Sequence, residues 1–219
     1  MGKDIVIELN RISFRYPSGR QVFAELDFIL SKGERVGITG PNGSGKTTLL
    51  HIIMGLLKPD MGEVKIFGKP RRTEEEFKEV RLKIGLLFQD PDDQLFCPTV
   101  VEDVVFGLLN LRKTHEEAHR IAQRTLKELG LEGFEERITY TLSGGEKRLA
   151  SLATVLAMEP KVLLLDEPTA GLDEETTERI IEVLTLSDLS YIVVTHDMEV
   201  LKRTTDCIYR LNDGKLHHL

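Results

Sequence analysis

Eight consecutive residues near the start of the chain have the types and spacing of a phosphate-binding loop. The segment Gly40–Thr47 reads GPNGSGKT and fits the pattern GxxxxGK[ST]. Glycines let successive backbone N–H groups turn toward phosphate oxygens, and a following helix adds partial positive charge at its N-terminus. Lys46 is expected to reach the β- and γ-phosphates, and the Thr47 hydroxyl to bind Mg²⁺. The residues expected around the triphosphate are Asn42, Gly43, Ser44, Gly45, Lys46, Thr47 and Thr48.

Two adjacent carboxylates, Asp166 and Glu167, follow the apolar segment Val162–Leu165. Such a run is typical of a strand buried on both faces, and α/β sheets bind ligands at the carboxyl ends of their strands. Asp166 is expected to position Mg²⁺, through water, and Glu167 to accept a proton from an attacking water. The loop and the carboxylates together predict an enzyme that hydrolyses a nucleoside triphosphate or transfers its phosphoryl group.

The elements that must position these residues predict an α/β fold with a parallel sheet. A β-rich run, Arg35–Thr39, enters the phosphate loop, and the apolar residues from Leu49 onward fit a helix that leaves it. Further strands are expected over Ile5–Leu9, Ile12–Tyr16, Val22–Leu30, Val64–Gly68, Ile84–Phe88 and Tyr191–Val194.

The middle of the chain predicts helices. Thr99–Glu102 and Thr114–Glu117 have the spacing of capping boxes, and apolar residues recur at helical spacing after the second until Gly130. The same periodicity returns over Leu149–Leu156 and stops at Pro160. One amphipathic face in this region is expected to pack against the rest of the protein.

The segment Thr141–Lys147, TLSGGEK, resembles the signature sequence of ATP-binding cassette ATPases, the motor subunits of ABC transporters. From the residues alone, Ser143, Gly144 and Gly145 form a helix-capping loop whose hydroxyl and backbone amides can bind a phosphate. The resemblance implies that this loop meets ATP held by an opposite subunit.

The family pattern covers essentially the whole chain. It implies a single domain over residues 1–219, with a RecA-like P-loop core and an antiparallel β portion in 1–88 and 159–219. Residues 89–158 are then a helical subdomain that carries the signature.

Four further residues resemble functional residues of the family. Tyr16 corresponds to the aromatic that stacks on adenine, and Gln89 to the glutamine that contacts Mg²⁺ and the lytic water and links the site to a membrane partner. Asp173 corresponds to an aspartate at the dimer interface, and His196 to a histidine that touches the γ-phosphate. Without the family, Tyr16 would be an ordinary strand aromatic, Asp173 a helix N-cap and His196 a surface or core histidine.

A finer resemblance lies in Phe88–Phe96, which reads FQDPDDQLF, and in the residues that follow it. This stretch is similar to the ATPases of energy-coupling factor transporters and of CbiO-type importers, which take up vitamins or transition-metal ions such as cobalt or nickel. Two departures from that pattern are Leu149, where an arginine is common, and the lack of a C-terminal extension after Leu219.

The resemblance implies ATP and Mg²⁺ as cofactors and two kinds of partner: a second ABC ATPase subunit, identical or similar, and integral membrane transporter subunits. The longest apolar run, Leu49–Leu57, is too short to span a bilayer, and the first residues lack the pattern of a signal peptide. A location in the cytoplasm, peripheral on the inner face of the membrane, is therefore expected.

Two other functions remain open at this point. A P-loop kinase for a small molecule would have no need of Ser143–Gly145 or of His196. A non-transport cassette ATPase acting on DNA or the ribosome is disfavoured by the lack of a coiled-coil insertion and by the acidic balance, since 29 basic against 36 acidic residues give a net charge of -7. No nucleic-acid partner is expected.

The cysteines and the remaining histidines suggest no further chemistry. Cys97 and Cys207 are expected as reduced, buried small side chains. His115 and His119 are expected to be solvated on a charged helix face, and His217–His218 to belong to a frayed terminus, so no metal site is expected among them.

Overall fold

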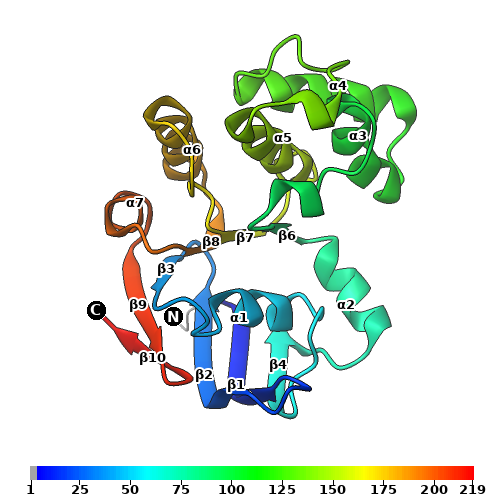
Figure 1. Cartoon of the computed structure of the whole chain (residues 1–219). Coiled ribbons are helices and arrows are strands. Elements are labelled where there is room, and N and C mark those ends of the chain that lie inside the picture. The colour runs from blue at the N-terminus through cyan, green and yellow to red at the C-terminus, as the bar shows by residue number, and fades with distance from the viewer. Residues whose placement is uncertain (1–3) are drawn as a thin grey trace.

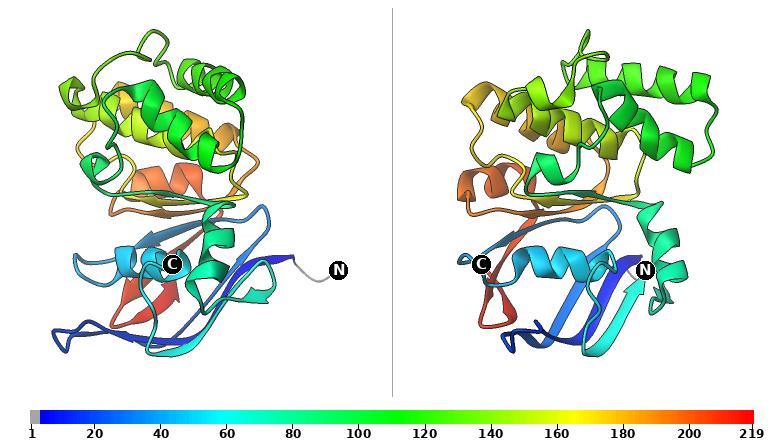
Figure 2. Two further views of the ribbon diagram at one scale, coloured as in Figure 1. Left: turned by 90° about the vertical axis from the view of Figure 1, so that its right-hand side faces the viewer. Right: turned by 45° about the vertical axis from the view of Figure 1, so that its right-hand side comes forward.

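Helix α1 (Lys46–Ile53) lies between two β-sheets in the computed structural model, which describes residues 4–219 (Figure 1). The strand order is β2-β1-β4-β5 in a four-stranded sheet and β10-β9-β3-β8-β7-β6 in a six-stranded sheet. The turned views in Figure 2 show the same layers, with most of the other helices stacked on the far side of the six-stranded sheet. The expected α/β class is confirmed.

The four-stranded sheet is antiparallel and consists of β1 (Ile5–Arg15), β2 (Gln21–Ser31), β4 (Met61–Ile66) and β5 (Lys69–Pro70). The two strands predicted over Ile5–Leu9 and Ile12–Tyr16 are one strand, so that prediction was wrong. Arg11 has a φ of 47° and the register shifts between Leu9 and Ile12. A β-bulge therefore absorbs the polar break that suggested a turn.

The six-stranded sheet is parallel except for β10. Its strands are β3 (Arg35–Thr39), β6 (Ile84–Leu87), β7 (Val162–Asp166), β8 (Ser190–Val194), β9 (Cys207–Asn212) and β10 (Lys215–His218). Every residue of β7 and β8 is buried, as the continuous apolar run of β7 predicted. The carboxyl ends of β3, β7 and β8 meet at one edge of this sheet.

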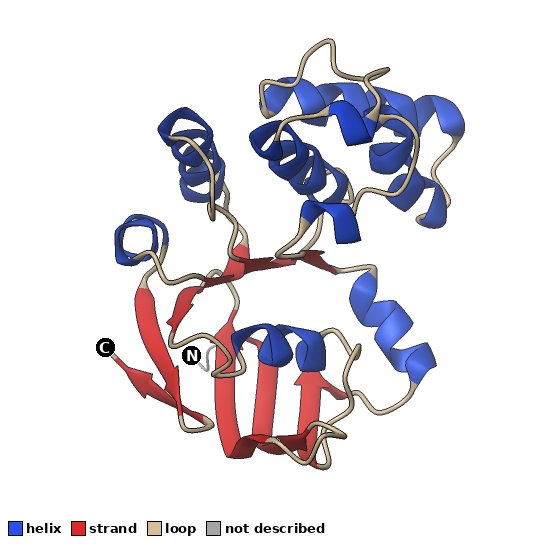
Figure 3. Ribbon diagram, in the orientation of Figure 1, coloured by secondary structure: helices blue, strands red, loops and turns tan. Residues whose placement is uncertain are grey.

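The helices on the far face are α3 (Val100–Asn110), α4 (His115–Glu128), α5 (Gly144–Leu156), α6 (Glu174–Leu186) and α7 (Met198–Thr204). Figure 3 shows these helices gathered on one side of the strands, while α2 (Glu74–Arg81) flanks the other end of the sheet. Both predicted capping boxes, at Thr99 and at Thr114, begin helices. Two short 3₁₀ turns, η1 (Pro91–Asp93) and η2 (Thr139–Thr141), precede α3 and α5.

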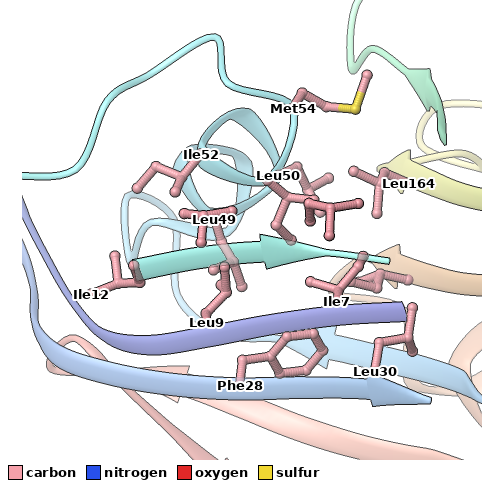
Figure 4. Close-up of a cluster of buried hydrophobic side chains, with 14 of the residues drawn as sticks. Ile7, Leu9, Ile12, Phe28, Leu30, Leu49, Leu50, Ile52, Met54 and Leu164 are labelled. Atoms are coloured by element: carbon pink, nitrogen blue, oxygen red, sulfur yellow. The ribbon is translucent and has the colours of Figure 1, made fainter. Parts of the chain in front are cut away.

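The hydrophobic side chains form two clusters, one on each face of the six-stranded sheet. Figure 4 shows the first, in which Leu49 and Leu50 of α1 pack between Ile7 and Leu9 of β1 and Leu164 of β7. The second joins α3, α4, α5 and α6 to the opposite side chains of β7 and β8. Each fully buried leucine of this kind contributes about 1.5–3 kcal/mol to folding. The six-stranded sheet is therefore held by packed side chains on both of its faces.

Several sequence-based expectations near the end of the chain were wrong. His217 and His218 lie in β10 and not in a frayed terminus, and the ring of His218 packs edge-on against Tyr209 at 5.2 Å. Cys97 and Cys207 are half-buried and not buried. The sequence patterns also missed α2, α7, β5, β9 and β10. His115 and His119 are exposed, as predicted.

Among the described residues, no helix is long and apolar enough to cross a membrane.

Candidate nucleotide site

The phosphate loop joins β3 to α1 and has a shape that only glycine permits at two positions. Gly40 has a φ of 154°, and a Cβ on it would lie 2.4 Å from the carbonyl oxygen of Leu211. Gly45, the residue before α1, has a φ of 107°, and a Cβ there would lie 2.4 Å from Val22. A Cβ would clash at both positions, so glycine is what lets the loop lie this close to Leu211 and Val22.

Lys46 folds back over this loop. Its Nζ donates hydrogen bonds to the carbonyl oxygens of Gly40 at 2.9 Å and Pro41 at 3.2 Å, and only 8% of the residue is exposed. The ammonium group therefore lies inside the curve of the loop. A phosphate group bound there could accept a hydrogen bond from it without a large movement of the side chain.

Asp166 ends β7 and is buried, with 3% of the residue exposed. Burial raises the pKa of its carboxyl group, and so does the neighbouring Glu167. A hydrogen bond from the Thr47 hydroxyl lowers it, as do the charges of His51 and Lys46. The contact between Thr47 and Asp166 brings together two of the three residues predicted to hold Mg²⁺, and the third, Gln89, lines the same cavity.

Glu167 follows Asp166 in a left-handed conformation with a φ of 47°. Its carboxylate accepts a hydrogen bond from the Thr195 hydroxyl at 2.9 Å, and the Nδ1 of His196 lies 3.1 Å from the same oxygen. A non-glycine residue in this region costs of order 1–3 kcal/mol, which surrounding contacts must offset. Here the ends of β7 and β8 hold the carboxylate in place, while the imidazole side chain is 73% exposed.

A cavity of about 330 Å³ brings most of the predicted site residues together. It is lined by Tyr16, Arg20, Val22, Asn42, Gly43, Gly45, Lys46, Thr47, Thr48, Gln89, Asp166 and Glu167. The Tyr16 hydroxyl lies 2.9 Å from the hydroxyl of Thr48, and its ring meets Phe14 edge-on. The cavity lining thus includes an aromatic ring as well as the two carboxylates.

Three residues of this region were missed by the sequence patterns. Thr195 holds the carboxylate of Glu167, and its place directly before His196 was the available signal. Arg20 donates a hydrogen bond to the carbonyl of Gly43, and both residues line the cavity. Arg148 of α5 donates to the backbone carbonyls of Phe88 and Gln89. Helical periodicity could not separate Arg148 from the exposed charges around it.

The structure does not bring every predicted residue to this cavity. Ser44 lines a neighbouring cavity, and its Oγ is buried without a hydrogen-bond partner. Ser143, Gly144 and Gly145 begin α5, where the Ser143 hydroxyl accepts from the backbone of Glu146, and Asp173 caps α6. None of these four lines the cavity around Lys46. Figure 1 shows α5 and α6 across the six-stranded sheet from α1.

Comparison with known proteins identifies the family of this chain. Residues 23–170 match the model of the family described as ABC transporter. The chain belongs to this family. It is 43% identical over 215 residues to the energy-coupling factor transporter ATP-binding protein EcfA of Methanocaldococcus jannaschii, an alignment that covers 96% of the chain and 77% of that protein.

Solved structures of ABC ATPases share the fold. The structure of cbiO1 from Clostridium perfringens, part of the ABC transporter complex cbiONQ, has a TM-score of 0.86 and 33% identity, with 98% of this chain and 88% of that one covered. The dimeric ATP-binding cassette MJ0796 bound to ADP and Pi has a TM-score of 0.90 and 31% identity, with 97% of each chain covered. The chain is therefore an ABC ATPase that binds and hydrolyses ATP as a transporter subunit.

Replacement of Lys46 by alanine tests the phosphate loop. A charge-assisted hydrogen bond contributes about 1.5–3 kcal/mol, so Lys46→Ala is expected to weaken binding of ATP by at least about 10-fold. Titration with a fluorescent ATP analogue measures this, with Lys58→Ala, a change at an exposed lysine, as the matched control. Unchanged affinity in the Lys46 variant would contradict the assignment.

Proposed function

We propose that this chain powers an importer by closing on ATP together with a second ATPase chain, the same or a similar one. The observation that carries the proposal is the division of the site. Lys46, Asp166 and Glu167 share one cavity, whereas Ser143 and Asp173 lie outside it on exposed helix starts. ATP held by the phosphate loop of one chain would meet Ser143, Gly144 and Gly145 of the other.

Each cavity residue has a role in this proposal. Tyr16 lines the cavity and would stack on adenine, and the backbone amides from Asn42 to Thr48, together with Lys46, would surround the phosphates. Asp173 would act from the second chain at the interface. Because Ser44 lines the neighbouring cavity, its contribution to ATP would come through its backbone.

The oxygen donors in the cavity fit Mg²⁺. A hydroxyl from Thr47, a carboxylate from Asp166 and an amide oxygen from Gln89 all line it, and Mg²⁺ prefers such oxygen ligands and few of them from protein. When bound, the ion would neutralise charge on the β- and γ-phosphates. These three residues are the ones we propose to hold it.

Hydrolysis needs a base beside the attacking water, and Glu167 fits that role. Its carboxylate is positioned by Thr195, and it is an acceptor for the water proton. His196, whose imidazole is largely exposed, would turn from Glu167 toward the γ-phosphate, and Gln89 would orient the water.

Movement follows because ATP binds the closed pair better than the open one. That differential affinity shifts the population toward closed dimers, and hydrolysis removes it. We propose that residues 89–158 move as one subdomain in this cycle and transmit the change to membrane subunits at the inner face of the membrane.

A groove beside Gln89 fits a segment of such a membrane subunit. It has a volume of about 240 Å³ and is lined by apolar side chains that include Met54, Phe88 and Met158. Phe96 and Phe106 meet edge-on at its rim and are 66% and 48% exposed. We propose that an apolar helical segment of the membrane subunit docks here, since large exposed aromatics beside a groove mark interaction sites.

Asp103 is a charged residue in the lining of this groove. It is buried, its Oδ1 accepts from the backbone of Phe96 and Cys97, and its Oδ2 has no partner. Burial raises the pKa of its carboxyl group. Asp103 therefore ties the residues before α3 to the helix that lines the groove.

The transported substrate is proposed from the relatives. Similarity to EcfA and to cbiO1 supports uptake of a small substrate, a vitamin or a transition-metal ion such as cobalt or nickel. The substrate itself would be recognised by the membrane partners.

Replacement of Glu167 by glutamine tests the catalytic role. The amide keeps the shape and can still accept from Thr195, but it cannot take a proton, so turnover is expected to fall at least about 100-fold while ATP still binds. Size exclusion with and without ATP is expected to show a stable ATP-dependent dimer. Glu182→Gln, at an exposed position, is the control; normal turnover or no ATP-dependent dimer in Glu167→Gln would refute the proposal.

Replacement of Phe106 by aspartate tests the groove. A charge on the apolar rim is expected to reduce recovery of integral membrane proteins with the tagged chain, purified from detergent-solubilised membranes, at least about 10-fold, the loss that 1.4 kcal/mol gives. ATP affinity of the isolated chain is expected to stay unchanged. Leu186→Asp, a similar change at a 77% exposed residue of α6, is the control. Equal recovery with both variants would contradict docking here.

A further inference from the structure

Arg148 is a buried cation in the first turns of α5. Only 4% of the residue is exposed. One guanidinium nitrogen donates to the carbonyl oxygen of Phe88 at 2.6 Å and the other to that of Gln89 at 2.5 Å. The Nε is buried without a hydrogen-bond partner. The fork of Arg148 therefore holds two consecutive peptide groups, the second of which belongs to the glutamine proposed to orient the lytic water.

A buried guanidinium is costly, and here no carboxylate forms an ion pair with it within the described residues. Burial lowers the pKa of Arg148, whereas the charges of Asp90, Asp166 and Glu167 act in the opposite direction. The cost of removing the guanidinium from water offsets much of what its two hydrogen bonds to backbone carbonyls contribute to stability. Apolar residues at buried charged positions often give a protein the same stability or more. The fixed planar fork gives instead a defined geometry, which a flexible side chain would not give.

Two further contacts tie the same segment to α5. Gln94 accepts from the backbone N–H of Phe88 at 3.1 Å and donates to the carbonyl of Ser151 at 2.9 Å. Lys147 pairs with Asp92 at 2.5 Å. Residues 88–94 are therefore bound to α5 at both ends and in the middle, and α5 begins with the residues proposed to meet ATP on the opposite chain.

We infer that Arg148 is a positioning residue for hydrolysis: it fixes the backbone of Gln89 to α5, so that the side chain of Gln89 reaches the water only when α5 has moved into place on the opposite chain. This rests on the proposed role of Gln89. Arg148 itself does not line the cavity around Lys46, and we expect no contact between it and ATP.

Kinetics of four variants of the full chain test this inference: Arg148→Met, Gln89→Ala, the double variant and Arg124→Met. Methionine keeps the apolar volume and removes both donors. A small misplacement of a catalytic group costs up to about 100-fold, so Arg148→Met is expected to lower kcat between about 10-fold and 100-fold while KM for ATP stays within about 2-fold. Arg124→Met changes an exposed arginine of α4 and is expected to change neither.

The double variant separates positioning from a general loss of structure. Because Arg148 acts through Gln89, Arg148→Met is expected to lower kcat by less than about 2-fold when Gln89 is already alanine. Arg148→Lys keeps the charge without the fork and is expected to retain more activity than Arg148→Met. If the Met variant does not fold, the same cycle with Arg148→Lys is measured, at a temperature where thermal melts show every chain folded.

Three results would overturn the inference. A loss of kcat that multiplies fully in the double variant would show that Arg148 acts independently of Gln89 and leave the proposed function intact. Wild-type kcat in both Arg148 variants would show that Arg148 does not position Gln89, and it would also leave the proposed function intact. Normal kcat in Gln89→Ala would instead remove the proposed role of Gln89 and the inference with it.

Discussion

The parallel pairing of β8 with both β3 and β7 is the constraint on which the site depends. It brings the ends of three strands that are far apart in the chain to one edge, so that the phosphate loop, the two carboxylates and His196 become neighbours. Because all residues of β7 and β8 are buried, this edge cannot shift without exposing the core on both faces of the sheet. The strained conformation of Glu167 is tolerated because Thr195 and the backbone of Val194 hold it.

The six-stranded sheet also separates the phosphate loop from the helices that we propose to move when ATP binds. The phosphate loop begins α1 on one face, while Ser143 begins α5 in the layer of helices on the other. The segment 88–94 connects these layers, because it follows β6 and is bonded to α5 through Arg148 and Gln94. In the proposed function, one chain supplies the phosphate loop and the two carboxylates, and the exposed start of α5 supplies Ser143 to the site of another chain.

The sequence predicted the strand ends well because their chemistry is local. GPNGSGKT needs glycine at its tight positions, and a short apolar run that ends in two acids is typical of a strand buried on both faces. The bulge at Arg11 was missed because a polar pair within a strand looks like a turn. Arg148 was missed because its partners are backbone carbonyls about sixty residues away in sequence, which no pattern of side-chain types reveals. The edge strand β10 was missed because its pairing with β9 depends on tertiary position and its residues are mostly polar.

The most direct test of the account is retention of ATP by a mixture of two defective chains. Both carry Glu167→Gln to prevent hydrolysis; one also carries Lys46→Ala and the other Ser143→Arg. Neither chain alone is expected to retain ATP through gel filtration, because every pair of identical chains has two damaged sites. Their mixture is expected to retain ATP in dimers that each have one intact site, made of the loop of one chain and the serine of the other. No retention by the mixture, or retention by the Ser143→Arg chain as a monomer, would contradict the shared site.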